Sequence, residues 1–169
     1  MAKSTFSGPV KSLAGFISAG VNNSVSLTAD TTLTVDAHAG KILLCNDADG
    51  KFTLPSIVST TPSDPTDPNQ ANNIGASFYF YIETAATDLD ILTDGTDKFK
   101  GAVLVAVDDG AKKAFVPAAS NDVMTMNGST KGGVVGSVVQ VTAIDTATYL
   151  VHDSLLIGSG TIVTPFADA

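Results

Sequence analysis

The sequence predicts an all-β protein: a single β-sandwich or jelly-roll-like domain with an extended N-terminal arm. Three observations lead to this fold class. Residues that favour helices are scarce, since the 169 residues include one Glu, two Gln and no Arg. Thr, Val, Ser, Gly and Asp, which favour strands and turns, are abundant. Short apolar runs, several of them alternating with polar residues, are separated by turn signals at a spacing of about ten residues, as in sandwiches and barrels.

Residues 1–23 differ in composition from the rest of the chain and are predicted to form the arm. Residues 1–29 contain two Lys and no acidic residue, whereas residues 30–169 contain all 17 acidic residues and the remaining Lys. Gly residues and Pro9 interrupt the segment, which disfavours regular structure. An ordinary first strand of the sheet is the alternative for this segment.

The domain is predicted to cover residues 24–169, with its strands following in order. Alternation over residues 25–35 indicates half-buried strands joined by a bend. The apolar run at 41–45, the turn cluster at 46–50 and the run at 51–55 together predict a β-hairpin.

A Pro-rich loop is predicted at residues 59–73, where Pro62, Pro65 and Pro68 recur at every third position. This spacing favours an extended polyproline conformation and excludes a central strand. Loops of this length are often functional, although a solvated surface excursion is the simpler interpretation.

The second half of the domain is predicted to contain most of the strands. Residues 76–83 carry aromatic side chains at consecutive positions, which predicts a central strand covered on both faces. Further strands are expected at 88–93, 99–107, 113–117, 134–144, 148–151 and 154–158, and residues 159–166 form an extended tail. Turn residues predict that 134–144 and 148–151 form a second hairpin.

The charge and the single cysteine exclude several classes of function. The net charge of −8 argues against nucleic-acid and anionic-lipid partners, because both require clustered Lys and Arg. The longest apolar runs are about six residues against the roughly twenty that a membrane span requires. Cys45 lies among apolar residues and is predicted to be an inert buried thiol. We therefore expect a soluble protein without nucleic-acid or membrane partners.

Asp-containing turns are the candidate cation sites. They are Asp47-Ala48-Asp49-Gly50, the Asp88/Asp90 pair, Asp94-Gly95 with Asp97, and Asp108-Asp109-Gly110. None has the twelve-residue calcium-loop pattern, and Asp and Gly dominate turns for purely conformational reasons. We interpret them as turns and expect no metal and no cofactor.

Catalytic motifs are also weak. His38 and His152 are far apart in the sequence. The segment His152-Asp153-Ser154 contains the residue types of a catalytic triad, but neighbours on a regular strand point to opposite faces. We therefore expect no catalytic residues and predict that the protein is not an enzyme.

Several short motifs occur in an order that resembles a known family. They are Phe6-Ser7-Gly8-Pro9-Val10-Lys11-Ser12 with Gly15-Phe16, Phe52-Thr53-Leu54-Pro55, residues 75–82, Thr93-Asp94-Gly95-Thr96-Asp97 with Gly101, Thr148-Tyr149-Leu150-Val151, Ser159-Gly160-Thr161 and Thr164-Pro165-Phe166. Together they resemble capsid decoration, or cement, proteins of tailed bacteriophages, especially small virion proteins of marine phages. The likeness spans most of the chain, whereas the Pro-rich loop lies outside it.

The resemblance implies a non-enzymatic virion protein on the outer surface of an icosahedral head. Such a protein binds at junctions between major capsid protein subunits, often as a homotrimer. The candidate capsid-docking residues lie in the arm: Lys3, Phe6, Pro9, Lys11 and Phe16. The Phe residues are candidate anchors, and the Lys residues could steer the arm towards its partner.

A host-recognition module of a tail fibre or head fibre is the main alternative. Such a module would bind surface glycans through the loop at 59–73 and the Asp-rich turns with calcium. The aromatic run at 78–81 could stack sugars or bases, but core packing explains it more simply. A major shell-forming subunit is a third possibility, and the short chain without helical segments disfavours it.

Overall fold

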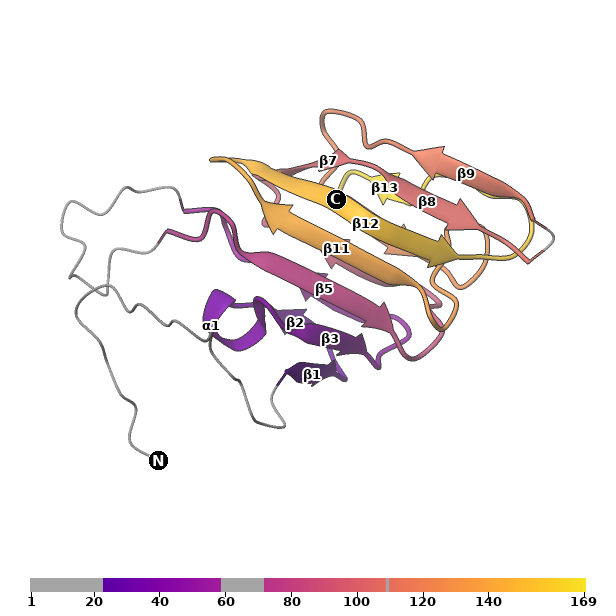
Figure 1. Ribbon diagram of the computed structural model, residues 1–169, viewed down its shortest axis with the longest axis horizontal. Coiled ribbons are helices and arrows are strands. Elements are labelled where there is room, and N and C mark those ends of the chain that lie inside the picture. The colour runs from indigo at the N-terminus through magenta and orange to yellow at the C-terminus, as the bar shows by residue number, and fades with distance from the viewer. Residues whose placement is uncertain (1–22, 59–71, 109) are drawn as a thin grey trace, which may run out of the picture.

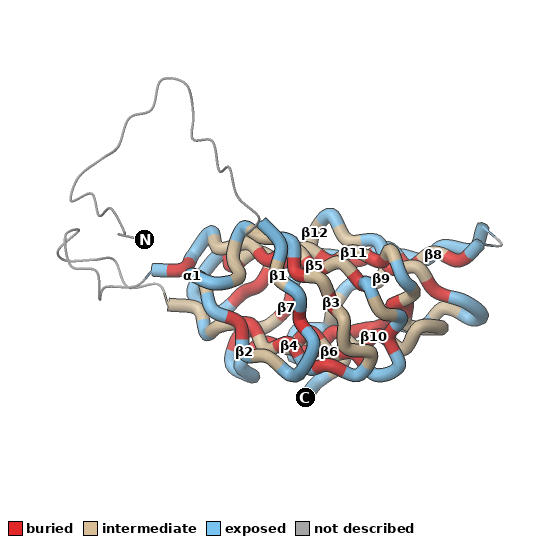
Figure 2. The backbone as a smooth tube through the Cα atoms, turned by 90° about the horizontal axis from the view of Figure 1, so that it is seen from below, coloured by how far each residue is buried: buried red, intermediate tan, exposed pale blue. Residues whose placement is uncertain are grey.

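The computed structural model describes residues 23–58, 72–108 and 110–169, and over these ranges the protein is an all-β sandwich (Figure 1). Two mixed sheets pack face to face, and the buried residues lie mainly between the two layers (Figure 2). The predicted all-β sandwich is therefore confirmed.

The larger layer, sheet A, consists in spatial order of β1 (Ser24–Leu27), β3 (Ile42–Cys45), β5 (Ser77–Ile82), β11 (Val138–Ala143), β12 (Thr148–Ile157), β8 (Val103–Ala106) and β9 (Lys112–Phe115). β7 (Lys98–Gly101) also pairs with β12. Sheet B consists of β13 (Phe166–Ala167), β10 (Val123–Met126), β6 (Leu89–Leu92), β4 (Lys51–Thr53) and β2 (Thr31–Thr32).

The first strands of the chain alternate between the two sheets. β1, β3 and β5 are parallel neighbours in sheet A, and β2, β4 and β6 are parallel neighbours in sheet B. The parallel pairing arises because the chain crosses to the other layer after each strand and returns in the same direction. This part of the protein is therefore a flattened coil rather than a series of hairpins.

The hairpin predicted for residues 41–55 is wrong for this reason. β3 and β4 lie in different sheets, and the segment between them crosses from one layer to the other. The Phe52 ring stacks across the interior on Phe80, with 6.4 Å between ring centroids. An Asp- and Gly-rich turn reverses the chain, but its composition does not specify whether the second strand pairs with the first or packs opposite it.

The strands predicted over residues 25–35 also follow the coil. Their bend leads from β1 in sheet A to β2 in sheet B. The short helix α1 (Val35–His38) then replaces the expected end of the strand, and the Thr34 side chain caps it by accepting a hydrogen bond from the Ala37 N–H.

One later prediction is confirmed and one is corrected. β11 and β12 form the predicted antiparallel hairpin, and β8 and β9 form a further antiparallel pair. The strand predicted to be covered on both faces is β5. Its residues Phe78, Phe80 and Ile82 are fully buried, whereas Tyr79 and Tyr81 on the other face are only half-buried. One face of this strand is therefore open.

Sheet A is irregular where β12 passes from β7 to β8. Gly101 ends β7 with a φ of +100°, and a Cβ atom there would collide with the carbonyl oxygen of Val151. Opposite this break, β12 bulges at Asp153, whose φ of 45° is in the left-handed region. The segments predicted at 148–151 and 154–158 are therefore one strand with a bulge.

Buried polar side chains hold together chain segments that are far apart in the sequence. The Tyr149 hydroxyl donates a 2.6 Å hydrogen bond to the Pro55 carbonyl oxygen. The Asn73 side chain accepts from the Val58 N–H and donates to the Ser56 carbonyl, so the two chain segments on either side of residues 59–71 are held together. The arm and most of the Pro-rich loop lie outside the described residues.

No helix in the described ranges is long and apolar enough to cross a membrane.

Candidate binding face

One row of side chains across the outer face of sheet A is almost entirely apolar. Pairing register aligns five residues from five strands: Leu44, Tyr81, Val138, Leu155 and Leu104. We call these the apolar row. Leu155 and Leu104 remain 40% and 39% exposed, and the other three are half-buried. Figure 1 looks onto this face, and no element of the described part of the chain covers it.

The row exists because of strand alternation. Successive side chains on a strand point to opposite faces, so Leu43 and Phe80 enter the core while Leu44 and Tyr81 face outward. In an ordinary solvated sheet face these outward positions would be polar. The adjacent row adds Ile42, which is 45% exposed.

A polar network lies beside the apolar row on the same face. We define it as Ser77, Gln140, Thr142, His152 and Asp153. The Gln140 side-chain amide and the Thr142 hydroxyl each donate to Ser77 Oγ at 3.0 Å. Thr142 Oγ1 lies 2.8 Å from His152 Nε2, and His152 Nδ1 lies 2.9 Å from Asp153 Oδ2.

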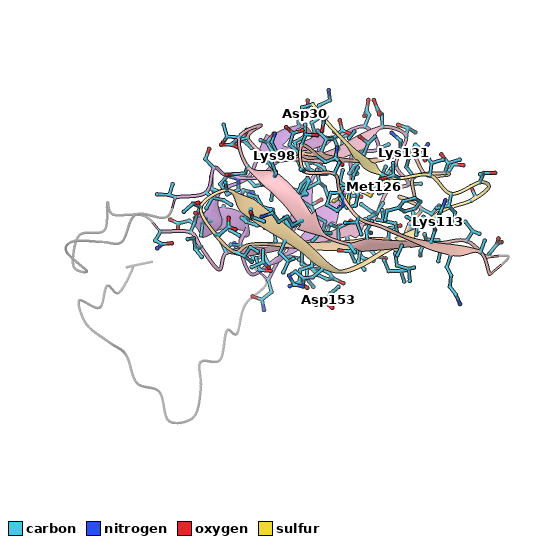
Figure 3. All side chains as sticks on the ribbon, turned by 90° about the horizontal axis from the view of Figure 1, so that it is seen from above. Asp30, Lys98, Lys113, Met126, Lys131 and Asp153 are labelled. Carbon is cyan, nitrogen blue, oxygen red and sulfur yellow. The ribbon has the colours of Figure 1, made fainter. Side chains whose placement is uncertain are left out.

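His152 and Asp153 form a hydrogen bond, contrary to the expectation that their side chains point to opposite faces. On a regular strand they would do so. The bulge at Asp153 changes the direction of its side chain, which points away from the body on the outer side of sheet A (Figure 3). Ser154 does not join these two residues in a triad. Its hydroxyl donates a hydrogen bond to the His152 carbonyl oxygen and accepts one from the Gln140 N–H.

Thr142, His152 and Asp153 are linked by successive contacts, but the Thr142 hydroxyl donates its proton to Ser77 Oγ, so it does not make the nucleophile-to-base hydrogen bond of a catalytic triad. Acyl transfer also requires donors aimed at the developing oxyanion. Thr142 lies on a strand paired on both sides, where backbone N–H groups serve the sheet ladders. The backbone N–H groups next to Thr142 are therefore engaged in the sheet and are not free to stabilise an oxyanion.

The other candidate residues have local structural roles. His38 Nδ1 lies 2.9 Å from the Thr34 backbone N, within the cap of α1. Asp94 Oδ1 accepts hydrogen bonds from the backbone N–H groups of Thr96 and Asp97, as the turn interpretation predicts. Burial opposes the ionisation of Asp94, but these hydrogen bonds, with others from Ser56 and the Thr96 hydroxyl, hold its pKa below the usual range. In the described ranges, no group of three or more His, Cys, Asp or Glu is placed to hold a metal ion.

Cys45 is buried in the core as predicted, and burial raises the pKa of its thiol to about 12. It is therefore protonated and unreactive at neutral pH.

The capsid-docking candidates Lys3, Phe6, Pro9, Lys11 and Phe16 all lie outside the described residues. Sequence reasoning did not identify the apolar row or the polar network. The alternation in β3, β5, β11 and β8 showed which residues share a face, but only the pairing register shows that five strands align their outward apolar residues.

Searches of protein-family models, of curated proteins and of solved structures found no match to this chain.

Proposed function

We propose that this protein is a non-enzymatic structural protein of a tailed-phage virion. It binds the outer surface of the capsid as a homotrimer, bridges neighbouring major capsid protein subunits and stabilises the head. The motif order described above supports the phage assignment. The observation that carries the binding role is the exposed apolar row across sheet A.

The apolar row has the physical properties of a protein-docking surface. Contiguous apolar patches that remain exposed on a folded domain commonly mark interaction sites. Within the row no residue is charged, so a partner could cover it without desolvating an ion. Tyr81 near its centre offers the large, low-entropy contact that is enriched at interface hot spots.

This mode of binding fits a lattice-stabilising role. A protein that binds only the assembled shell stabilises that shell by mass action. Weak contacts made by several copies in one oligomer add through effective concentration. A flat face and the arm could then contact different capsid subunits.

Location is the first experimental test. Virions of the phage that carries this sequence would be labelled with an antibody against the protein and imaged by immunogold electron microscopy. Gold on the head supports the proposal. Gold on the tail, or unlabelled particles, contradicts it.

Surface variants then test which region docks. Tyr81→Lys combined with Leu155→Lys should weaken binding to heads lacking the protein by about 100-fold or more, because it places two charges in the interface. The matched control places Lys at Thr53 and Thr125 on the outer face of sheet B, and it should bind normally. Phe6→Ala with Phe16→Ala tests the arm in the same assay.

A glycan-binding function in host recognition is the second candidate, and the polar network favours it. Half-buried Tyr79 pairs with Gln140 in the register, and Gln140 pairs with His152. An aromatic ring beside amide, imidazole and carboxylate groups offers both stacking and hydrogen bonding to a sugar. A glycan array would test this, with Tyr79→Ser and Gln140→Ala as variants. A specific ligand that both variants lose would favour this function over capsid binding.

A further inference from the structure

The two edge strands of sheet A are β1 and β9, and each is paired on one side only within the described part of the chain. Both have four residues. Exposed edges carry backbone groups that can pair with a strand of another chain, so proteins usually protect them. The side chains at the two edges show which pairings are possible.

The β9 edge carries positive charge. Lys112 and Lys113 are adjacent and exposed, and strand alternation directs them to opposite faces of the hairpin. The Lys113 ammonium lies 5.4 Å from the centroid of the Phe115 ring. Val116, just beyond the strand, is 71% exposed. The nearest described acid in the sequence is Asp108, in the turn that leads into this strand.

The surroundings of β1 are acidic. The Asn46 side-chain amide donates to both Ser26 Oγ on β1 and the carboxylate of exposed Glu83. Asp30 follows β1 and accepts a hydrogen bond from the Lys51 backbone N–H. Asp47 and Asp49 follow β3, the neighbouring strand.

The carboxylates near β1 are close enough to influence one another. Loss of hydration, a hydrogen bond with Asp49, and the negative charges of Asp49 and Asp30 raise the pKa of Asp47. Lys51 is the described cation nearest to this cluster in the sequence.

We propose that sheet A continues between copies of this chain, with the Lys-bearing β9 edge of one copy pairing against the acidic β1 edge of the next. Pairing of β9 with β9 would bring four ammonium groups together, and pairing of β1 with β1 would do the same for carboxylates. The head-to-tail arrangement brings opposite charges together. Such contacts are heterologous and generate rings or filaments according to the rotation between copies.

The register gives a second reason for this pairing. The pairing register extends the apolar row by one residue at each end, to Ser26 on β1 and to Ala114 on β9. The extended row therefore reaches both edges of the sheet. Joining β9 to β1 would extend this face from one copy into the next and cover Val116. This inference deepens the homotrimer of the proposed function, because it names the edges through which copies associate and requires no capsid.

The experiment is sedimentation velocity of the full chain over a concentration series, with no particle present. A four-residue strand pairing is a small interface, so association should be weak and favoured by low salt. The weight-average mass should rise above the 17.2 kDa of one chain with increasing concentration. A mass that stays at the monomer value throughout overturns the proposal.

Charge exchange tests the pairing itself. Lys112→Glu with Lys113→Glu, and separately Asp47→Lys with Asp49→Lys, should each weaken association about tenfold. Mixing the two variants should restore association, because each acidic edge then faces a basic one. Failure of the mixture to associate overturns the proposal. Circular dichroism confirms that both variants are folded.

Lys100→Glu with Lys131→Glu is the matched control, since it makes the same charge change at residues outside strand β9. Unchanged association of this control supports the edge pairing, and an equal loss overturns it by showing a net-charge effect. Head binding is measured separately, so either proposal can fail alone.

Discussion

The outer faces of the two sheets differ in chemistry, although both sheets bury apolar residues on their inner faces. Sheet A presents the apolar row and, beside it, the polar network. Sheet B pairs Lys51 with Asp90 and Asp90 with Thr125 across its outer face. The next outward row of sheet B contains Leu92 and Val123, but Val123 is only 5% exposed. The outer face of sheet A thus leaves its apolar residues more exposed, whereas the exposed positions of sheet B are mainly charged and polar.

This difference separates what folding requires from what binding requires. The core between the sheets is complete without the outward residues of sheet A, since Phe52, Phe80 and Met124 are fully buried. Outward apolar residues contribute less to stability because they remain partly exposed. In the proposed function, these residues are covered by a partner.

The first prediction concerns the backbone of sheet A. Gly101→Ala should destabilise the protein by about 4 kcal/mol, because it adds backbone strain and a collision with the Val151 carbonyl oxygen. Urea unfolding measures the change. Gly95→Ala is the matched control, since Gly95 has a φ of +88° and open space around the added Cβ. It should cost only about 1 kcal/mol. Equal effects would contradict the packing explanation.

A second variant tests the contact between the layers at Lys98 and Asp122, whose Nζ and Oδ2 atoms lie 2.6 Å apart. Lys98→Met should destabilise the protein by about 2 kcal/mol at neutral pH, because the Asp122 side chain is only 9% exposed and loses its cation.

The pH dependence provides a check on the same pair. Burial opposes ionisation of Asp122, but Lys98 and the Ala169 N–H hold its pKa below the usual Asp value. This carboxylate therefore stabilises the fold above the unfolded pKa of about 4, and the contribution is lost as the pH falls through its lower folded pKa. Lys98→Met should flatten the acid limb of the stability curve. An acid limb equally steep in Lys98→Met and in the wild type would contradict the stabilising role of the Lys98–Asp122 pair. Burial raises the pKa of Asp97, which affects the acid limb in the opposite direction. The measurement therefore compares the acid limbs of the wild type and Lys98→Met.

The sequence predicted the layers of this fold better than their connections. Alternation and turn residues indicated all-β structure and the β11–β12 hairpin. The parallel coil could not be foreseen, because the turn at 46–50 has the same composition whether the next strand pairs or crosses. The contact of His152 with Asp153 depends on a left-handed residue other than Gly, for which the sequence has no clear signal.

A third variant tests a buried, unpaired carboxylate oxygen in sheet B. Asp90 Oδ1 is buried and has no hydrogen-bond partner. Asp90→Thr should stabilise the protein by about 1 kcal/mol, because it removes an unsatisfied carboxylate oxygen and introduces a residue that favours strands. Thermal unfolding measures the gain. Head binding should not change, since this position is on the opposite side of the sandwich from the apolar row.

The smallest expected effect separates stability from binding most directly. Ile42 and Leu43 are neighbours on β3, but Ile42 is 45% exposed and Leu43 is fully buried. Leu43→Thr should destabilise the protein by about 3 kcal/mol, as expected for a polar truncation in a packed core. Ile42→Thr should cost about 0.5 kcal/mol, because much of its side chain stays in water in the free protein. If Ile42→Thr nevertheless weakens head binding severalfold, the outward apolar residues of sheet A serve a partner. If it destabilises the fold as much as Leu43→Thr does, those residues belong to the core, and the contrast between the two outer faces has no bearing on function.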